Sequence, residues 1–130
     1  MLTTTGAFSS FSVDDLDEAL RFYRDRLGLT IVATPMGLEL TLAGGGSVFI
    51  YDKGERHAAA GFTVLNLVVA DMDSAVAELA AAGIELLRYP DFPGQGEDGV
   101  ARSDSPDDGP TIAWISDPAG NVVGIIEERA

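Results

Sequence analysis

The feature that most constrains this chain is an internal repeat. Residues 12–17 read Ser-Val-Asp-Asp-Leu-Asp and residues 68–73 read Val-Val-Ala-Asp-Met-Asp, and each segment ends a run of strand-forming residues and opens a helical pattern. Around both segments the predicted order is strand, helix and then three strands. A block that occurs twice in this way is typical of a duplicated supersecondary unit. We therefore expect two similar modules.

Two segments have the apolar periodicity of a helix, with hydrophobic residues three or four positions apart. Asp14 or Asp15 can cap the start of the first segment, and Asp71 stands at the start of the second. A glycine follows each segment, as is common where a helix ends. The pattern predicts helices over residues 15–26 and 71–82.

Short segments rich in valine, isoleucine, threonine and aromatic residues predict strands, and glycine, proline and aspartate separate them. The predicted strands are residues 7–13, 29–34, 38–42, 47–51, 63–69, 85–89, 111–115 and 121–127. The expected fold class is α+β. It is a single domain over residues 1–130, with one βαβββ module at about residues 6–54 and a second at about residues 61–128.

The stretch between Pro90 and Pro110 breaks this pattern, because it is polar and rich in glycine and proline. A loop of this length inside a compact domain tends to be either functional or disordered. The stretch is therefore a lid over a binding pocket or a mobile surface insertion, and the residues alone leave both interpretations open.

The charge of the chain narrows the choice of partners. It carries 21 acidic and 8 basic residues, a formal net charge of −13, so its surface repels phosphate backbones and anionic lipids. No apolar run approaches the roughly 20 residues that span a bilayer, and the first residues do not resemble a signal peptide. We expect a cytoplasmic protein with neither nucleic acid nor membrane as partner. The chain has no cysteine, which excludes disulfides, thiolate catalysis and cysteine-bound metals.

Two motifs resemble a known superfamily. Residues 22–29, Phe-Tyr-Arg-Asp-Arg-Leu-Gly-Leu, preceded by Val-Asp-Asp-Leu, resemble the first module of the vicinal-oxygen-chelate superfamily of glyoxalase I, bleomycin- and fosfomycin-resistance proteins and extradiol dioxygenases. Asp-Pro-Ala-Gly-Asn at residues 117–121 resembles the turn before the last strand of its second module. The resemblance covers about residues 6–127. It implies a curved, mainly antiparallel open barrel with the helices on the convex face and a ligand on the concave face.

In metal-dependent members of that superfamily, the first and last strands of the modules supply ligands to a divalent cation. The resemblance places these positions at Phe8, Phe49, Val64 and Gly124. A shift of two residues gives Ser10, Tyr51, Asn66 and Ile126. Neither set is a conventional group of ligands, and Glu127, three residues beyond Gly124, is expected on the opposite face. We therefore expect neither a metal ion nor a cofactor there.

Strand alternation also describes the face that a ligand would meet. This face is predicted to be apolar and aromatic with a few hydroxyl and amide groups, as small-molecule sites usually are. The predicted pocket residues are Phe8, Ser10, Phe49, Tyr51, Val64, Asn66, Trp114 and Gly124. The aromatic residues could also simply fill the core, whereas the amide of Asn66 needs a partner if it is buried.

Other polar residues give weaker signals. Arg102 is a possible contact for an anionic ligand, and a solvated or acid-paired arginine is the competing interpretation. His57, the single histidine, is predicted to lie exposed in the linker between the modules. No Ser/His/Asp arrangement can be argued, so no catalytic residue is assigned.

Three functions fit these residues. The leading hypothesis is a small-molecule-binding protein without the usual metal site, similar to the drug-sequestering resistance proteins. The alternative is a metal-dependent glyoxalase- or dioxygenase-like enzyme, a lyase, isomerase or oxygenase, with displaced ligands. A further alternative is a protein-interaction module on the same scaffold. The resemblance also implies a homodimer, whose modules pair within one chain or swap between chains, and whether the chain catalyses a reaction stays open.

Overall fold

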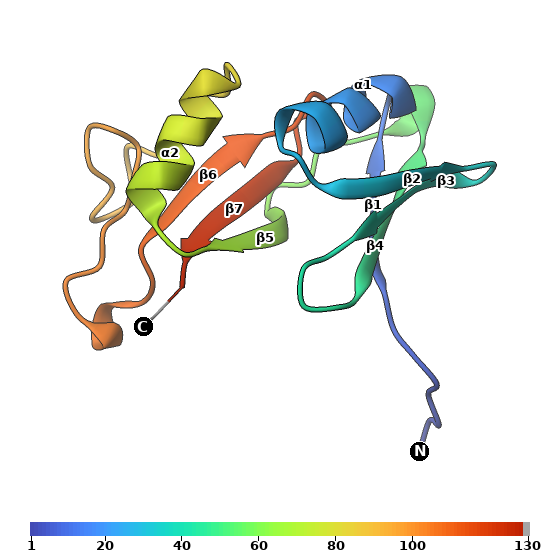
Figure 1. The fold of residues 1–130 in the computed structure, drawn as a ribbon, viewed down its shortest axis with the longest axis horizontal. Coiled ribbons are helices and arrows are strands. Elements are labelled where there is room, and N and C mark those ends of the chain that lie inside the picture. Colours follow the sequence, from blue (N-terminus) through green and yellow to red (C-terminus); the bar gives the residue numbers. More distant parts are fainter. Residues whose placement is uncertain (129–130) are drawn as a thin grey trace. The chain divides into compact units, whose positions relative to one another are not determined.

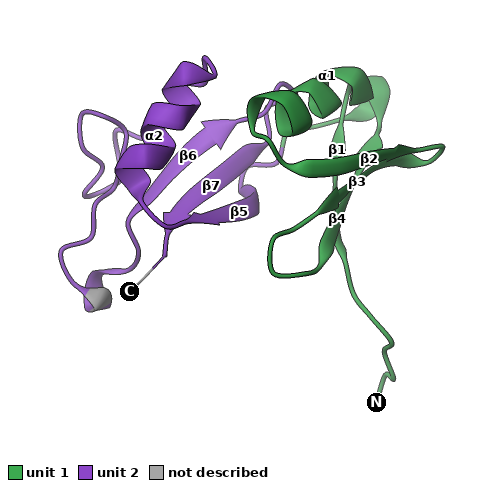
Figure 2. Ribbon diagram, viewed as in Figure 1, with its two compact units in different colours: residues 1–59 green, residues 60–130 purple. Residues whose placement is uncertain are grey.

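The computed structural model describes residues 1–128 and shows a mixed α+β fold, so the predicted fold class is confirmed (Figure 1). The chain divides into two compact units, Met1–Ala59 and Ala60–Ala130, here called unit 1 and unit 2 (Figure 2). Each unit combines one main helix with one open sheet. No helix among the described residues is long and apolar enough to cross a membrane.

Unit 1 contains a four-stranded sheet. Its strands are β1 (Ser9–Val13), β2 (Thr30–Thr34), β3 (Gly37–Thr41) and β4 (Ser47–Asp52). They lie in the order β1-β4-β3-β2, parallel between β1 and β4 and antiparallel elsewhere. The predicted helix spans α1 (Leu16–Leu20) and a π-helical continuation, η1 (Arg21–Arg26). A short 3-10 turn, η2 (Gly54–Arg56), follows the sheet.

The first helix begins at a side-chain cap and then widens. Asp15 accepts a hydrogen bond from the backbone N–H of Glu18 at 3.1 Å, which confirms Asp15 as the cap. In η1 the backbone N–H of Leu27 donates to the carbonyl of Phe22, five residues back, at 2.9 Å. The adjacent Phe22 and Tyr23 are both buried, with their ring centroids 5.0 Å apart. The wider turn thus places two consecutive aromatic residues in the core of unit 1.

Unit 2 contains a three-stranded sheet covered on one face by a helix (Figure 1). Its strands are β5 (Thr63–Val69), β6 (Ile112–Ser116) and β7 (Val122–Glu127), in the order β5-β7-β6. The pair β5 and β7 is parallel, and the pair β6 and β7 is antiparallel. The helix is α2 (Met72–Ala81), and η3 (Pro106–Asp108) is a 3-10 turn in the loop before β6.

The strand predicted at residues 85–89 does not form, which corrects the expected βαβββ order of the second module. The backbone N–H of Leu87 donates to the carbonyl of Trp114 at 2.7 Å. The next stretch of the same strand edge is taken by Ala101, which exchanges both backbone hydrogen bonds with Ile112. The edge of β6 is therefore shared between two segments, and neither of them pairs over a strand's length.

The predicted turn between β6 and β7 is held by two buried polar residues. Asp117 Oδ1 accepts the backbone N–H groups of Ala119 and Asn121 at 2.9 and 2.8 Å. Asn121 Nδ2 donates to Asp117 Oδ2 at 3.2 Å, and its Oδ1 accepts the backbone N–H of Ala60 at 3.4 Å. Asp117 is only 4% exposed and Asn121 1%. The turn is therefore a structural device that needs both polar side chains.

Strand alternation separates the two faces of the sheet in unit 2. The residues that face α2 are buried and apolar: Leu65, Ala113, Ile115, Val123 and Ile125. They pack with Met72, Ala75 and Leu79 of the helix, which are also buried. The opposite face has no helix of unit 2 upon it, and we call it the open face of unit 2.

Candidate functional site

Three of the predicted pocket residues form one row across the open face of unit 2. In the strand register Asn66 on β5 pairs with Gly124 on β7, and Gly124 pairs with Trp114 on β6. Residues that pair across a sheet point to the same face. The amide, the glycine and the indole therefore lie side by side on the helix-free face, with the glycine on the middle strand.

Gly124 makes room for the side chain of Asn66. A Cβ at position 124 would overlap Asn66 Oδ1, and it would lie 3.3 Å from the methyl group of Thr63. The carboxamide therefore leans over Gly124, along the row toward Trp114. Asn66 is exposed, and no described residue hydrogen-bonds to its carboxamide. Its donor and acceptor are available to another molecule.

The edge of the sheet beside Asn66 differs from the predicted one. The pairing of β5 with β7 shifts between Thr63 and Leu65, which marks a bulge. Strict alternation assigned Val64 to the open face, but the methyl group of Thr63 is the one that lies near Gly124. Val64 is half-buried at the bulge. Thr63 was missed because a bulge breaks the alternation on which the prediction relied.

Trp114 is the centre of an aromatic cluster that the loop completes. The ring of Tyr89 meets the indole edge to face, with centroids 5.3 Å apart. The ring of Phe92 does the same at 5.0 Å. Edge-to-face contacts of this kind are favourable by about 1 kcal/mol each beyond the area that they bury. Tyr89, Phe92 and Trp114, the aromatic cluster of unit 2, were predicted only in part, since sequence reasoning selected Trp114 alone.

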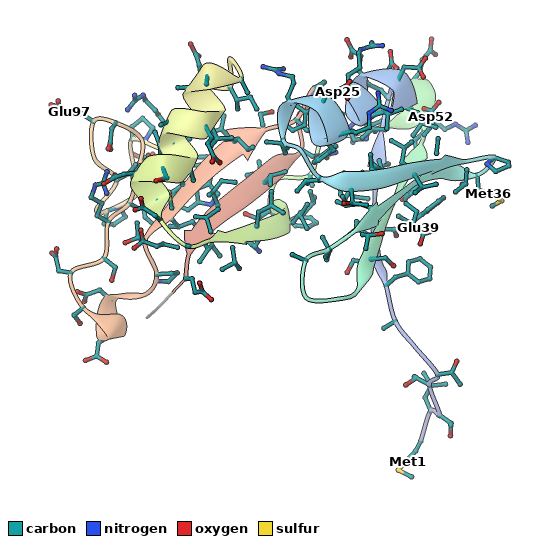
Figure 3. The ribbon with its side chains drawn as sticks, in the orientation of Figure 1. Met1, Asp25, Met36, Glu39, Asp52 and Glu97 are labelled. Carbon is teal, nitrogen blue, oxygen red and sulfur yellow. The ribbon has the colours of Figure 1, made fainter. Side chains whose placement is uncertain are left out.

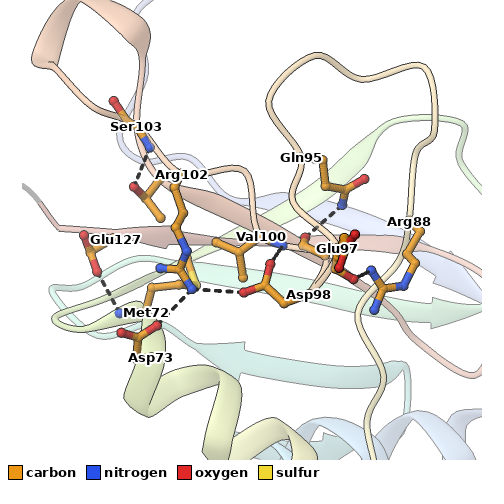
Figure 4. Close-up of polar contacts among 12 residues, drawn as sticks. Met72, Asp73, Arg88, Gln95, Glu97, Asp98, Val100, Arg102, Ser103 and Glu127 are labelled. Atoms are coloured by element: carbon orange, nitrogen blue, oxygen red, sulfur yellow. Dashed lines mark hydrogen bonds and ion pairs between the residues drawn. The ribbon is translucent and has the colours of Figure 1, made fainter.

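Gln95 fixes the loop that carries this cluster. Its Oε1 accepts the backbone N–H of Tyr89 at 2.6 Å, and its Nε2 donates to the carbonyls of Leu87 and Gly99 at 2.9 and 2.8 Å. Figure 4 shows Gln95 reaching across the loop. A single side chain thus joins both arms of residues 87–99. Sequence reasoning missed Gln95, because a glutamine in a stretch of glycine and proline has no pattern that marks it.

The open face of unit 2 carries no charge within its strands. Its described side chains are those of Thr63, Asn66, Val68, Ile112, Trp114, Ser116, Val122 and Ile126. Val68 is 66% exposed, although it is apolar. In a chain whose formal charge is −13, an uncharged face on which Asn66 and Val68 are exposed and the other side chains are half-buried is a local exception. Exposed apolar surface beside a few polar groups is typical of a binding surface.

The remaining predicted pocket residues lie in unit 1. Ser10 pairs with Phe49, and Phe49 pairs with Glu39, so these side chains share the face of the sheet away from α1. Figure 3 shows Glu39 on that side. The rings of Phe49 and Tyr51 stack with centroids 6.3 Å apart and planes 13° apart. Phe8 precedes β1 and is 70% exposed. Sequence reasoning missed Glu39, which puts a carboxylate on this face.

His57 is not the exposed linker residue that the sequence predicted. Its Nδ1 lies 2.8 Å from Ser12 Oγ in a hydrogen bond, and the imidazole is half-buried. Ser12 pairs with Tyr51 in the sheet, so the histidine ties the segment after η2 back onto β1. A partner so distant in sequence leaves no local signal.

Arg102 lies at the start of α2 and is paired with acids. Its Nη2 is 3.0 Å from both Asp73 and Asp98 (Figure 4). The hydrogen bond from the backbone N–H of Val100, followed by the contact with Arg102, lowers the pKa of Asp98. The same two aspartates raise the pKa of Arg102. Since Asp73 belongs to the helix side of the sheet, Arg102 does not join the row of Asn66 and Trp114.

Glu127 also faces the helix, as alternation predicted. Its Oε2 accepts the backbone N–H of Met72, the first residue of α2, at 2.8 Å (Figure 4). A carboxylate at this place satisfies a free N–H group and interacts favourably with the positive end of the helix dipole. Glu127 therefore stabilises the start of α2 and is absent from the open face.

Comparisons with known proteins give the family. The model of the Glyoxalase/Bleomycin resistance protein/Dioxygenase superfamily matches residues 7–125. The chain belongs to this superfamily. A comparison with curated proteins found no match.

Solved structures of the superfamily have the same fold. TnmS3, an antibiotic binding protein from a Streptomyces species, is 22% identical with a TM-score of 0.65, over 98% of this chain and all (100%) of that one. A genomically encoded fosfomycin resistance protein from Listeria monocytogenes is 11% identical with a TM-score of 0.64, over 98% of this chain and 96% of that one. Lactoylglutathione lyase from Agrobacterium tumefaciens is 22% identical with a TM-score of 0.62, over 95% and 94%.

The residues at the metal positions of the superfamily do not fit a metal ion. The resemblance places them at Phe8, Phe49, Val64 and Gly124, and phenylalanine, valine and glycine side chains have no donor atom for a cation. Within residues 1–128 no three side chains of histidine, cysteine, aspartate or glutamate are gathered as a metal site would require. No step of any reaction is therefore derived through a metal ion.

Proposed function

We propose that this protein binds a small, planar, uncharged molecule on the open face of unit 2 and does so without a metal ion. The observation that carries the proposal is the row of Asn66, Gly124 and Trp114 on a face without helix or charge, where Asn66 is exposed and the indole is half-buried. A charged ligand would lose hydration there without gaining an opposite charge in return. An uncharged ring has no such cost.

The aromatic cluster supplies the apolar contact. The indole of Trp114 is half-buried under Tyr89 and Phe92, so part of it remains open to a ligand. A ring that packs against an indole gains about 0.5–1.5 kcal/mol beyond the area buried. The apolar residues around it, such as the exposed Val68, extend the surface that a ligand would cover. The antibiotic binding named for TnmS3 is consistent with such a role for this scaffold.

Isothermal titration calorimetry with 2-naphthol in the presence of EDTA tests this function. Wild-type protein should bind the compound with the chelator present. Trp114→Phe, which keeps a ring at the same place, should retain most of the affinity, and Trp114→Leu should weaken binding at least about fivefold, as expected for the loss of about 1 kcal/mol. Equal binding by Trp114→Leu, or binding that EDTA abolishes, would overturn the proposal.

We also propose that the protein forms a homodimer. Val32, on the face of unit 1 away from α1, and Phe8, just before β1, are 57% and 70% exposed, and a second chain would remove such residues from water. The strands β1 and β2 are the edges of their sheet and can pair with another chain. Light scattering at micromolar concentration should give twice the mass of the chain, and a monomer would contradict this proposal. The cytoplasmic location remains a prediction from the sequence.

A further inference from the structure

The carboxamide of Asn66 has three properties that bear on binding. It is exposed, it has no hydrogen-bond partner among the described residues, and it lies in the space that Gly124 leaves open. A free surface amide normally samples many directions, but this one lies in the space that the missing side chain of Gly124 leaves, beside the methyl group of Thr63. The carboxamide is thus presented next to an aromatic surface, with Oδ1 toward Gly124 and with neither its donor nor its acceptor used by the described residues.

The spacing of the row sets the size of what can lie between the amide and the indole. Asn66 and Trp114 stand on the two strands that flank β7. Neighbouring strands lie about 4.8 Å apart, so the two backbones are roughly 10 Å apart. The carboxamide of Asn66 itself lies over Gly124, so the gap that remains between it and the indole is about one strand spacing. A planar ring in this gap would have one face at the indole and one edge at the carboxamide.

A carboxamide forms its best pair of hydrogen bonds with one kind of molecular edge. Its N–H₂ group donates and its oxygen accepts in the same plane, so it forms two parallel hydrogen bonds with a neighbour that presents an acceptor beside a donor. A ring C=O next to a ring N–H, as in a lactam or an imide, is such an edge. An ammonium group or a carboxylate would match only half of the carboxamide, and it would meet no opposite charge within the strands of this face.

We propose that Asn66 selects ligands that are flat rings with a lactam-type edge, in which a ring N–H lies next to a ring C=O. This inference rests on the proposed function of the open face of unit 2 and names the chemical class that the site prefers. Trp114 contacts the ring, Asn66 pairs with the edge, and Gly124 acts as a positioning residue because it leaves the space that holds the carboxamide.

Three probes of the same ring size test the proposal. They are 2-quinolone, which has the lactam edge, N-methyl-2-quinolone, which has the carbonyl but no N–H, and naphthalene, which has neither. Trp114 is the single tryptophan, so its indole N–H gives one resonance that reports binding in a two-dimensional NMR titration. We expect 2-quinolone to bind wild-type protein about tenfold more tightly than either other probe, since one or two net hydrogen bonds are gained.

Three variants test whether the preference for a lactam edge depends on Asn66 and Gly124. Asn66→Leu should bind all three probes within about twofold of one another, because the amide is gone. Gly124→Ala keeps Asn66 but occupies the space where its carboxamide rests, so it should also lose the preference. Glu78→Gln, at an exposed residue of α2 on the opposite side of the sheet, is the control and should keep it. Far-UV circular dichroism of each variant confirms that the fold is retained.

The outcomes distinguish the lactam preference from the binding function. Equal binding of the three probes to wild-type protein would overturn the lactam preference and leave the binding function standing. A preference that survives in Asn66→Leu would overturn the role of the amide. An indole resonance that ignores every probe but shifts with protein concentration would show that a second copy of the chain covers this face, and it would overturn both the preference and the function.

Discussion

Gln95 should control both the stability of unit 2 and the environment of Trp114. Its side chain makes three hydrogen bonds of 2.6, 2.9 and 2.8 Å to the backbone of residues 87–99. A typical net hydrogen bond contributes about 0.5–1.5 kcal/mol, and the half-buried position of Gln95 places these bonds in the lower part of that range. We therefore expect Gln95→Leu to lower the free energy of unfolding by about 2 kcal/mol.

The structure also predicts how Gln95→Leu will change the fluorescence of Trp114. Without the three hydrogen bonds of Gln95, the two arms of the loop should separate. Tyr89 and Phe92 should then move away from the indole that they contact. The fluorescence maximum of native Trp114 should then shift to the red before any global unfolding. Gln95→Glu is the companion variant: it keeps the acceptor for the backbone N–H of Tyr89 but sets a carboxylate oxygen against the carbonyls of Leu87 and Gly99, so near neutral pH its effect should be at least as large as that of Gln95→Leu.

Urea unfolding followed by circular dichroism and by Trp114 fluorescence measures both effects. If Gln95→Leu had the same urea midpoint and the same emission maximum as wild type, the hydrogen bonds of Gln95 would not hold the aromatic cluster in place. A loss of stability without any change in emission would mean that Gln95 stabilises the loop and leaves the aromatic contacts untouched. Either result would refute the reasoning that links Gln95 to Trp114.

Three further changes probe other parts of the chain. Asp117→Ala removes the acceptor of two backbone N–H groups in the β6–β7 turn and should cost about 2 kcal/mol of unfolding free energy in urea titrations. Glu127→Ala should cost about 1 kcal/mol by removing the acceptor at the start of α2, and Glu128→Ala, at an exposed neighbouring site, should be nearly neutral. The pKa of Asp98 is lowered first by the hydrogen bond from the N–H of Val100. Its stabilising effect is therefore present above about pH 4, the ordinary value for aspartate, and is lost as pH falls through the lowered pKa. The difference in melting temperature between wild type and Asp98→Asn should narrow in acid, and a constant difference would contradict this.

Local pattern was sufficient for much of the fold. The repeated aspartate motif located both helix starts, and Asp15 is the cap, one of the two aspartates that were candidates. Alternation placed Glu127 on the helix side of β7, where it meets Met72. The predicted pocket, which rests on the family resemblance as well as on alternation, included Asn66 and Trp114, and the strand register brings these two into one row. These features follow from backbone periodicity, so a single sequence contains them.

The features that sequence reasoning missed depend on contacts between distant residues. The segment 85–89 has strand composition, but Ala101 takes part of the edge that it needed. A bulge exchanged Thr63 for Val64 beside Gly124. The hydrogen bonds of Gln95 and the partner of His57 involve no periodic pattern at all. Competition for a strand edge, a bulge and a long-range side-chain hydrogen bond all depend on which distant residues meet in the folded chain. Composition and alternation describe only local sequence, so they did not predict these features.

The proposed function requires the open face of unit 2 to bind a planar molecule without a metal ion. Native mass spectrometry of protein purified without added metal, mixed with 2-quinolone in the presence and absence of EDTA, tests it most directly. We expect a complex of one 2-quinolone per chain whose abundance EDTA leaves unchanged, and a less abundant complex with Trp114→Leu at the same concentrations. A chain that carries one divalent metal ion, with a 2-quinolone complex that disappears when EDTA removes the ion, would contradict it.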